Sequence, residues 1–250
     1  FHHARRSVKP TQPRRSYPAC LPAAAGLAVC RPRLPAGAEE YVAELFGRQP
    51  VHVRLARPRR TKLGDHRPPS RKVAFHRITI NDDLNPYAFL TTLLHEIAHV
   101  ATWQRHGGRR RVKPHGSEWK QEFGGILRPV VEGRILPAGV EVALARYLEN
   151  PAARSCSDRG LVLALAEFDC PVTDKIRVED LAEATVFKAA NGTLFRAGRM
   201  VRSRRQCFEI PSGCEYRVHG LVFVEPVSAS QRSAAGFPVE SGGAREGQSR

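Results

Sequence analysis

The chain has 250 residues and a formal net charge of +16, a length that allows one sizeable domain or two small ones. A positive surplus of this size favours polyanionic partners such as nucleic acid and disfavours acidic partners. No apolar run reaches the roughly 18 residues that a membrane-spanning helix needs. We therefore expect no membrane partner.

Residues 1–34 are basic and rich in proline. They contain seven lysines and arginines, five prolines and no acidic residue. This composition predicts a disordered segment or a mis-assigned N-terminal extension. The stretch 19–30 is faintly similar to an export signal with a lipidated Cys30. We set export aside, because Pro18 and Pro22 interrupt the stretch and Val29 is a poor residue before a lipidated cysteine.

The next segment predicts a helix followed by strands. Residues 38–47 carry apolar side chains at helical spacing, and residues 51–55 alternate as a strand. Residues 57–71 are predicted to be a basic loop. Residues 73–81 return to a strand pattern with a short break.

A long helix is predicted between Asn85 and Gly107. Asparagine is a favoured N-cap, and Pro86 suits the first helical position. Two glycines, beginning at Gly107, are a typical helix end. Apolar residues recur at three- and four-residue spacing and predict one buried face: Tyr87, Leu90, Leu94, Ile97 and Ala101.

This helix contains the sequence HEIAH at residues 95–99. Residues four apart project from one face of a helix about 6 Å apart. His95 and His99 can therefore hold one Zn²⁺ at roughly 2.0–2.1 Å each. Glu96 lies one residue along, where it can take a proton from an attacking water. The pattern predicts metal-assisted hydrolysis of an amide bond, with zinc as the cofactor and a protein or peptide as the substrate.

A third zinc ligand must come from elsewhere, because a catalytic zinc usually has three protein ligands and one open position. His106 lies seven residues beyond His99, about 10 Å along the helix axis, which is too far. His115 is the better candidate, because the chain reverses before it and a second helix follows it. The carboxylates of Glu118 and Glu122 on that second helix are the alternatives.

Together these motifs resemble the SprT-like family of zinc metalloproteases, which includes the eukaryotic protease Spartan, and they resemble its compact bacterial type most. The resemblance covers residues 35–130. It rests on five stretches: 61–67 (TKLGDHR), 76–81 (HRITIN), 85–90 (NPYAFL), 93–99 (LLHEIAH) and 115–120 (HGSEWK).

The resemblance implies roles at the matching positions. His115 opens a segment similar to the family's H-G-x-x-[FW]-[KR], whose histidine is the third zinc ligand. The family's catalytic glutamate corresponds to Glu96, and the family gives no metal role to His66 or His76. The implied fold class is α+β, with a zincin-like protease domain of helices and a small sheet.

DNA is a candidate partner. Spartan-type members of the family cleave proteins covalently trapped on DNA and depend on DNA for activity. Residues 105–113, between the second and third expected ligands, contain no acid and five cations: Arg105, Arg109, Arg110, Arg111 and Lys113. A second basic cluster lies near the C-terminal end: Arg196, Arg199, Arg202, Arg204 and Arg205. Aromatic residues are not interleaved with these charges, so base-specific reading is not expected.

The sequence changes character beyond the expected protease domain, which spans residues 35–150. Residues 151–183 are predicted to be a helical linker. Residues 184–227 predict a small antiparallel β module, with hairpin turns at Asn191-Gly192 and at 211–213. Residues 228–250 have the composition of a disordered tail.

The cysteines limit the number of metal sites. Some family members carry a zinc ribbon after the protease domain, and a ribbon needs two close cysteine pairs. The six cysteines of this chain, at positions 20, 30, 156, 170, 207 and 214, form no C-x-x-C pair. We therefore expect a β module without a zinc ribbon, and one zinc ion. No disulfides are indicated, so a reducing, cytoplasmic location is the simplest expectation.

The function expected from the sequence is that of a zinc-dependent metalloendopeptidase, with DNA-associated or DNA-crosslinked proteins as candidate substrates. Two alternatives belong to other classes. One is a DNA-binding module with an idle protease site, and the other is a zinc peptidase with no nucleic-acid role.

Overall fold

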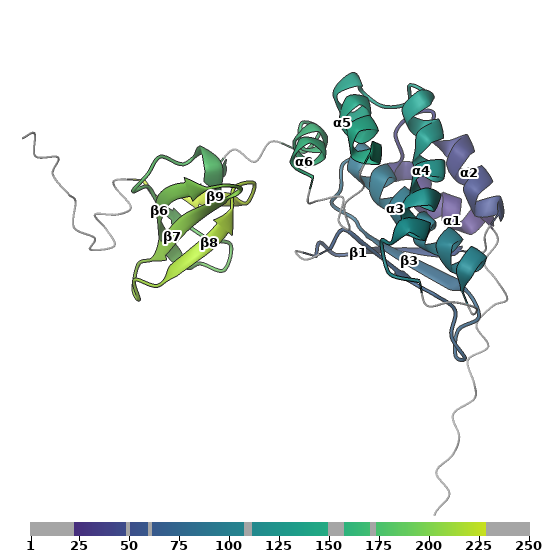
Figure 1. Cartoon of the computed structure of the whole chain (residues 1–250), viewed down its shortest axis with the longest axis horizontal. Helices are drawn as coiled ribbons and strands as arrows, with labels where there is room; N and C mark the ends of the chain where they lie inside the picture. The colour runs from purple at the N-terminus through teal and green to yellow at the C-terminus, as the bar shows by residue number, and fades with distance from the viewer. Residues whose placement is uncertain are drawn as a thin grey trace, which may run out of the picture. The chain divides into compact units, whose positions relative to one another are not determined.

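The computed structural model describes residues 23–48, 51–59, 62–107, 112–149, 158–170 and 174–228. The chain divides into two compact units, with the boundary between Asp169 and Cys170 (Figure 1). Each unit has its own hydrophobic core. Helices and mixed sheets together make this an α+β protein. Among the described residues, no helix is both long and apolar enough to cross a membrane.

The first unit combines helices with a small sheet. Its helices are α1 (Ala23–Cys30), α2 (Glu39–Arg48), α3 (Pro86–His106), α4 (Ser117–Glu132), α5 (Ala138–Glu149) and α6 (Arg159–Ala166). A short 3-10 helix, η1 (Arg31–Arg33), follows α1. Its strands are β1 (Val51–Ala56), β2 (Gly64–Arg67) and β3 (His76–Asn81).

The sheet of the first unit has the strand order β1-β3-β2, with β1 parallel and β2 antiparallel to β3. Alternate residues of β1 and β3 are buried: Val51, Val53, Ile78 and Ile80. Helix α3 contacts β2 and β3, and α1 contacts β1, so the helices cover one face of the sheet (Figure 1). The alternate residues His52, Arg54, Arg77 and Thr79 share the other face of the sheet, because strand side chains alternate.

Helix α3 begins and ends where the sequence predicts. The Asn85 side chain accepts hydrogen bonds from the backbone N–H groups of Tyr87 and Ala88, and Pro86 occupies the first helical position. The Asn85 amide also donates to the carbonyl oxygen of Leu165 at 2.9 Å. Asn85 therefore caps the start of α3 and also ties it to α6. Most of α3 is buried in the core.

Residues 23–33 form ordered helix, which corrects the expectation of a disordered segment over residues 1–34. They form α1 and η1, while residues 1–22 lie outside the described part of the chain. Helix α1 is apolar and packs against α2 and β1. Cys30 is fully buried in the core, and burial raises the pKa of its thiol to about 12. Burial of this apolar helix offsets the entropy of ordering it.

Strand β2 lies inside the segment predicted to be a basic loop, and that prediction is wrong for residues 64–67. The segment lacks apolar alternation, so its own sequence carries no strand signal. Its conformation comes from pairing with β3, where Gly64 lies opposite Ile80 and His66 opposite Ile78. The break within residues 73–81 was expected at His76 and Arg77, but both lie inside β3, and the interruption comes before them, at residues 74–75.

Helix α6 lies within the expected linker of residues 151–183 but belongs to the core of the first unit. Its Leu161 and Ala164 are buried in that core. The Asp158 side chain accepts a hydrogen bond from the Leu161 N–H and caps the helix. The apolar face of this short helix is covered by α5, against which it packs.

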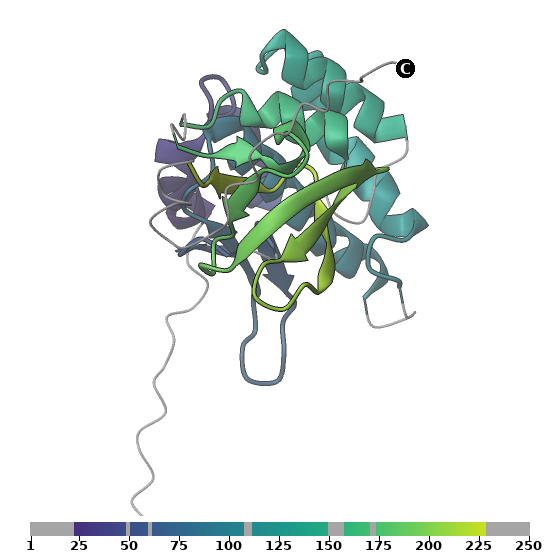
Figure 2. The same ribbon diagram turned by 90° about the vertical axis from the view of Figure 1, so that its left-hand side faces the viewer.

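The second unit is an antiparallel sheet. Its strands are β4 (Ile176–Arg177), β5 (Val186–Lys188), β6 (Leu194–Val201), β7 (Arg204–Glu209), β8 (Glu215–His219) and β9 (Phe223–Pro226), with a short 3-10 helix η3 (Val178–Asp180). The strand order is β4-β9-β5-β6-β7-β8, and the twist of this sheet is visible in Figure 2, in green to yellow-green. The two predicted hairpins, β5–β6 and β7–β8, are both present.

The basic cluster predicted in this unit divides between surface and core. Arg205 is only 5 % exposed and donates hydrogen bonds to the carbonyl oxygens of Gly198 and Glu179. The other four arginines of the cluster are exposed. Arg205 therefore joins β6, β7 and η3 inside the unit and is not part of its charged surface.

Candidate metal centre

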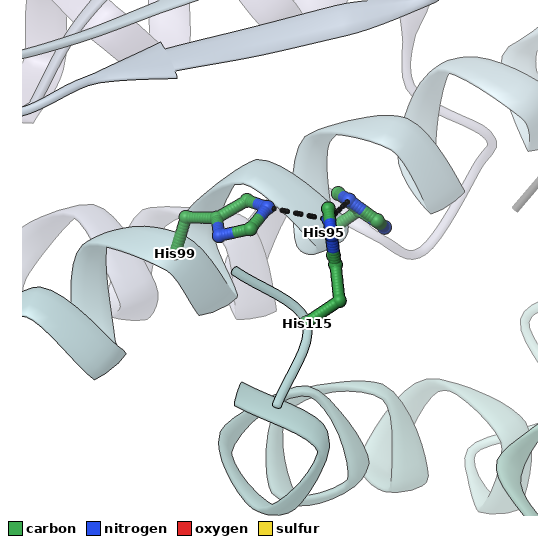
Figure 3. Close-up of side chains that lie close together, drawn as sticks. All are labelled: His95, His99 and His115. Carbon is green, nitrogen blue, oxygen red and sulfur yellow. Dashed lines mark hydrogen bonds between the residues drawn. The ribbon is translucent and has the colours of Figure 1, made fainter. Parts of the chain in front are cut away.

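Three histidine side chains converge beside the middle of α3. The Nε2 atom of His115 lies 3.1 Å from Nε2 of His95 and 3.0 Å from Nε2 of His99. One ligand atom from each lies within 4.8 Å of the other two. His95 and His99 project from α3, and His115 reaches them from the loop before α4 (Figure 3). Among the described residues this is the group of histidine, cysteine and carboxylate side chains that can hold a metal ion.

The spacing of the three nitrogens fits a tetrahedral zinc site. Two nitrogens that each lie 2.0–2.1 Å from a tetrahedral ion are about 3.3 Å apart, close to the 3.0 and 3.1 Å of the two pairs. An imidazole nitrogen has one in-plane lone pair or one N–H, so Nε2 of His115 cannot hydrogen-bond well to both neighbours. A shared cation satisfies all three lone pairs at once, so the donor set fits a metal.

His115 reaches the other two histidines through an unusual backbone conformation. Its φ is 59°, in the left-handed region that residues with a side chain rarely adopt. Gly116 follows as the N-cap of α4. Such a conformation costs roughly 1–3 kcal/mol and persists where surrounding structure or function requires it. This turn directs the imidazole of His115 back towards α3.

Trp119 forms a packed support beside all three histidines. Its ring centroid lies 4.6 Å from that of His95, 5.4 Å from that of His99 and 4.7 Å from that of His115. It is fully buried and stacks on Phe123 at 4.8 Å. The sequence analysis placed Trp119 within the stretch HGSEWK, at the [FW] position of the family segment, but gave it no role at the site. Its contacts restrict the rotation of the imidazoles and connect the site to the core.

The protonation of the histidines favours metal binding. Burial, together with the neighbouring histidines, lowers the pKa of His95 to about 3 and that of His99 to about 2. Burial also lowers the pKa of His115. Neutral imidazole is the form that binds a metal, so near neutral pH no proton must be displaced.

Glu96 follows His95 on α3 and carries a buried side chain. It is 5 % exposed, and within the described part of the chain it makes no hydrogen bond or ion pair. Burial and, to a smaller extent, the charge of Asp65 raise its pKa to about 8, against the opposing effect of Arg59 and Lys62. A divalent cation at the histidines would favour the carboxylate form and oppose the increase. A buried, unpaired carboxylate is costly to keep and is typical of functional sites.

Gly64 of β2 packs directly against Glu96, a contact that the sequence analysis missed. A Cβ atom at Gly64 would lie 2.7 Å from Oε1 of Glu96 and 2.8 Å from Cγ2 of Thr92. Only a glycine allows β2 to approach the carboxylate this closely. The glycine was visible in the sequence, but nothing in the sequence placed it against α3.

A polar network holds β2 in this position. Arg59 forms an ion pair with Asp65 and donates from Nε to Oδ1 of Asn81 at 2.7 Å. The Asn81 amide donates in turn to the carbonyl oxygens of Arg59 and Lys62, both at 3.2 Å. The network joins the connection before β2 to the end of β3.

The alternative carboxylate ligands lie elsewhere. Glu122 pairs with Arg105 at 2.8 Å, and Glu118 accepts a hydrogen bond from the Ser117 hydroxyl at 3.0 Å. Neither belongs to the metal-binding group.

His66 and His76 form a separate pair next to the site. His66 Nε2 lies 2.8 Å from His76 Nδ1, and the His66 ring stacks over His99 at a centroid distance of 6.2 Å. His76 also contacts Trp103 edge-on. These two side chains lie within hydrogen-bond distance of each other and are not part of the metal-binding group.

The residues expected to contact nucleic acid are only partly described. Arg105 and Lys113 lie on either side of the loop, and Arg105 is engaged with Glu122. Arg109, Arg110 and Arg111 lie outside the described residues.

The comparisons with known proteins agree with this geometry. Residues 34–130 match the SprT-like family. The matched segment contains β1 to β3, α3, nearly all of α4, the three histidines and Glu96, and the match indicates a metalloprotease-type domain. No curated protein and no solved structure matched the chain. Helices α5 and α6 and the second unit lie beyond the SprT-like segment.

Replacing Gly64 with alanine is expected to damage this site without removing its three histidines. The added Cβ must displace the Glu96 carboxylate or β2. We expect cleavage activity to fall at least roughly tenfold and the free energy of unfolding to fall by about 1–3 kcal/mol, with zinc content unchanged. Activity, chemical denaturation and metal analysis measure the three quantities.

Gly124→Ala is the matched control for this substitution. Gly124 lies inside α4, and a Cβ there meets no atom within 4 Å. We expect it to preserve activity and to increase stability by about 0.5–1 kcal/mol, because alanine favours helix. A Gly64→Ala protein with normal activity and stability would show that β2 does not position Glu96.

Proposed function

We propose that this protein is a zinc-dependent metalloendopeptidase, with a zincin-like first unit and a second unit that carries no zinc ribbon. The observation that carries the proposal is the convergence of His95, His99 and His115, two of them on the helix that also carries the buried Glu96. Membership of residues 34–130 in the SprT-like family supports it.

The roles of the residues follow from their chemistry. The three histidines would hold Zn²⁺ as neutral ligands, so the ion would keep its full charge. When bound, the ion supplies Lewis acidity and lowers the pKa of a coordinated water to about 7. Glu96 would accept the proton of the attacking water and return it to the leaving amine. Gly64 packs against the Glu96 side chain, and Trp119 packs against the imidazoles.

A pocket beside His99 offers a place for a substrate side chain. It has a volume of about 330 Å³ and is lined by rings and apolar side chains, among them Trp103, Trp119, Pro114 and Val112, with the cation Lys113 at its edge. A concave, largely apolar site with few polar groups is typical of ligand recognition.

We propose that DNA-associated proteins are among the substrates, because basic residues flank the site. Lys113 lines the pocket beside His99, and the net charge of the chain is +16. Polyanion binding near the histidines would bring a DNA-bound protein close to the site.

The experiment measures zinc content together with cleavage of a DNA-bound basic protein, with and without DNA. Cleavage that requires zinc and rises with DNA supports the proposal. Zinc-dependent cleavage that ignores DNA favours a peptidase without a nucleic-acid role. Tight DNA binding with zinc present and no cleavage favours a DNA-binding module with an idle protease site.

A further inference from the structure

The outer face of the first sheet, opposite α3, carries a basic pocket that contains none of the metal-centre residues. The register places residues of three strands side by side there. In one row His52 lies opposite Arg77, and Arg77 lies opposite Arg67. In the next row Arg54 lies opposite Thr79, and Thr79 opposite Asp65. These residues share one face because strand side chains alternate.

The face forms a pocket of about 510 Å³ with a strongly positive lining. The lining includes five cations and one carboxylate, so its net charge is +4. The cations are Arg54, Arg59, Lys62, Arg67 and Arg77, and the carboxylate is Asp65. Arg59 and Lys62 come from the connection before β2, so the charge extends from the sheet onto the loop. We define this set as the basic face.

The single carboxylate does not neutralise the basic face. Asp65 pairs with Arg59, with Lys62 at 3.1 Å and with Arg67 at 3.4 Å. Within the described part of the chain, Arg54 and Arg77 make no ion pair. Arg67 and Arg77 lie directly opposite each other, an arrangement of like charges that destabilises a sheet. An anionic ligand would relieve this repulsion.

We propose that the basic face binds the sugar-phosphate backbone of nucleic acid. Four of its five cations are arginines, whose planar guanidinium groups match phosphate oxygens in pairs. The charges span three strands and a loop, which suits a run of phosphates better than a single anion. The pocket lining contains no phenylalanine, tyrosine or tryptophan on which bases could stack. Binding is therefore independent of sequence and sensitive to salt.

This inference goes beyond the proposed protease function and does not depend on it. Gly64 packs against α3, and His66 contacts His76. The basic face is on the opposite side of the sheet from these two residues. It also differs from the loop between residues 105 and 113. Binding can be measured on full-length protein that carries Glu96→Gln, so a failure of the protease proposal leaves the result unaffected.

The test measures binding of a labelled DNA duplex by fluorescence anisotropy across a salt series. The first variant is R54Q/R77Q, and R54Q/R67Q is a second in case the half-buried Arg77 is needed for folding. We expect each to weaken binding at least roughly tenfold and to lower the slope of log K against log salt by nearly 2, because each lost phosphate contact accounts for about 0.9. Two unrelated duplex sequences should give the same affinities.

The control R128Q/R146Q removes two charges from exposed positions of α4 and α5 and should leave both affinity and slope nearly unchanged. Equal weakening by this control would overturn the proposal, as would an absence of binding by the wild-type protein. Loss of binding only in R105Q/K113Q would place the interface at the loop and would also overturn it. Equally tight binding of polyglutamate, weakened by the same variants, would make the partner an acidic protein and reject nucleic acid.

Discussion

Glu96→Gln is expected to lower the rate of peptide-bond cleavage by about 10²–10⁴-fold, the contribution typical of general acid–base catalysis, while zinc content stays complete. Glutamine has nearly the same shape, so it can occupy the same space against Gly64, but its amide cannot accept the proton of the attacking water. Because the three histidines are unchanged, the metal should remain bound. Turnover of a protein substrate and metal analysis of the same preparation measure both quantities.

Glu132→Gln is the matched control for Glu96→Gln. It makes the same chemical change at an exposed position at the end of α4, and we expect it to leave cleavage and zinc content unaltered. Undiminished cleavage by Glu96→Gln protein at full zinc occupancy would contradict the assignment of Glu96 as the base.

Replacing His115 with alanine or glycine is expected to weaken zinc binding at least about 100-fold and to abolish cleavage. Loss of a partner that only orients a ligand already costs 10–100-fold in metal affinity, so loss of a ligand should cost more. His95 and His99 alone leave an ion with two protein ligands, fewer than catalytic zinc sites use. Competition with a chelator of known affinity measures the change.

The backbone conformation of His115 provides a second readout. At φ 59° glycine is favoured over alanine by roughly 1–2 kcal/mol. His115→Gly protein should therefore be the more stable of the two variants, although both lose zinc. Equal stability would mean that the left-handed turn relaxes when the imidazole is removed.

Controls for the ligand assignment come from the same region of the chain. His106→Ala removes a histidine near the end of α3, and Glu118→Gln removes an alternative carboxylate. Both proteins should bind zinc like the wild type. If Glu118→Gln lost zinc and His115→Ala kept it, the third ligand would be the carboxylate.

The parts of the fold that could be predicted have local causes. Helix α3 follows from the Asn85 cap, Pro86 and a regular apolar spacing, each of which acts within a few residues. The pairing of His95 and His99 on one face follows from the same helical period. The two hairpins of the second unit follow from their turn residues.

Strand β2 and helix α1 could not be predicted in this way. The sequence of β2 lacks an alternating pattern, and its strand conformation depends on β3, beyond a connecting loop. Helix α1 has an apolar composition that also fits other structures, and its packing against α2 and β1 decided its conformation. Both elements are stabilised by contacts that a local pattern does not contain.

The sequence by itself determined the chemistry of the site, because histidine and glutamate at helical spacing have few other uses on a buried helix face. Only the tertiary structure decided how that chemistry is arranged. It brought His115 within 3.1 Å of His95, placed Gly64 against Glu96 and set Arg77 beside Arg67 on the opposite face of the sheet. The physical reason is that each of these contacts joins residues at least ten positions apart. Strand register and packing set such distances, and residue spacing along the chain does not.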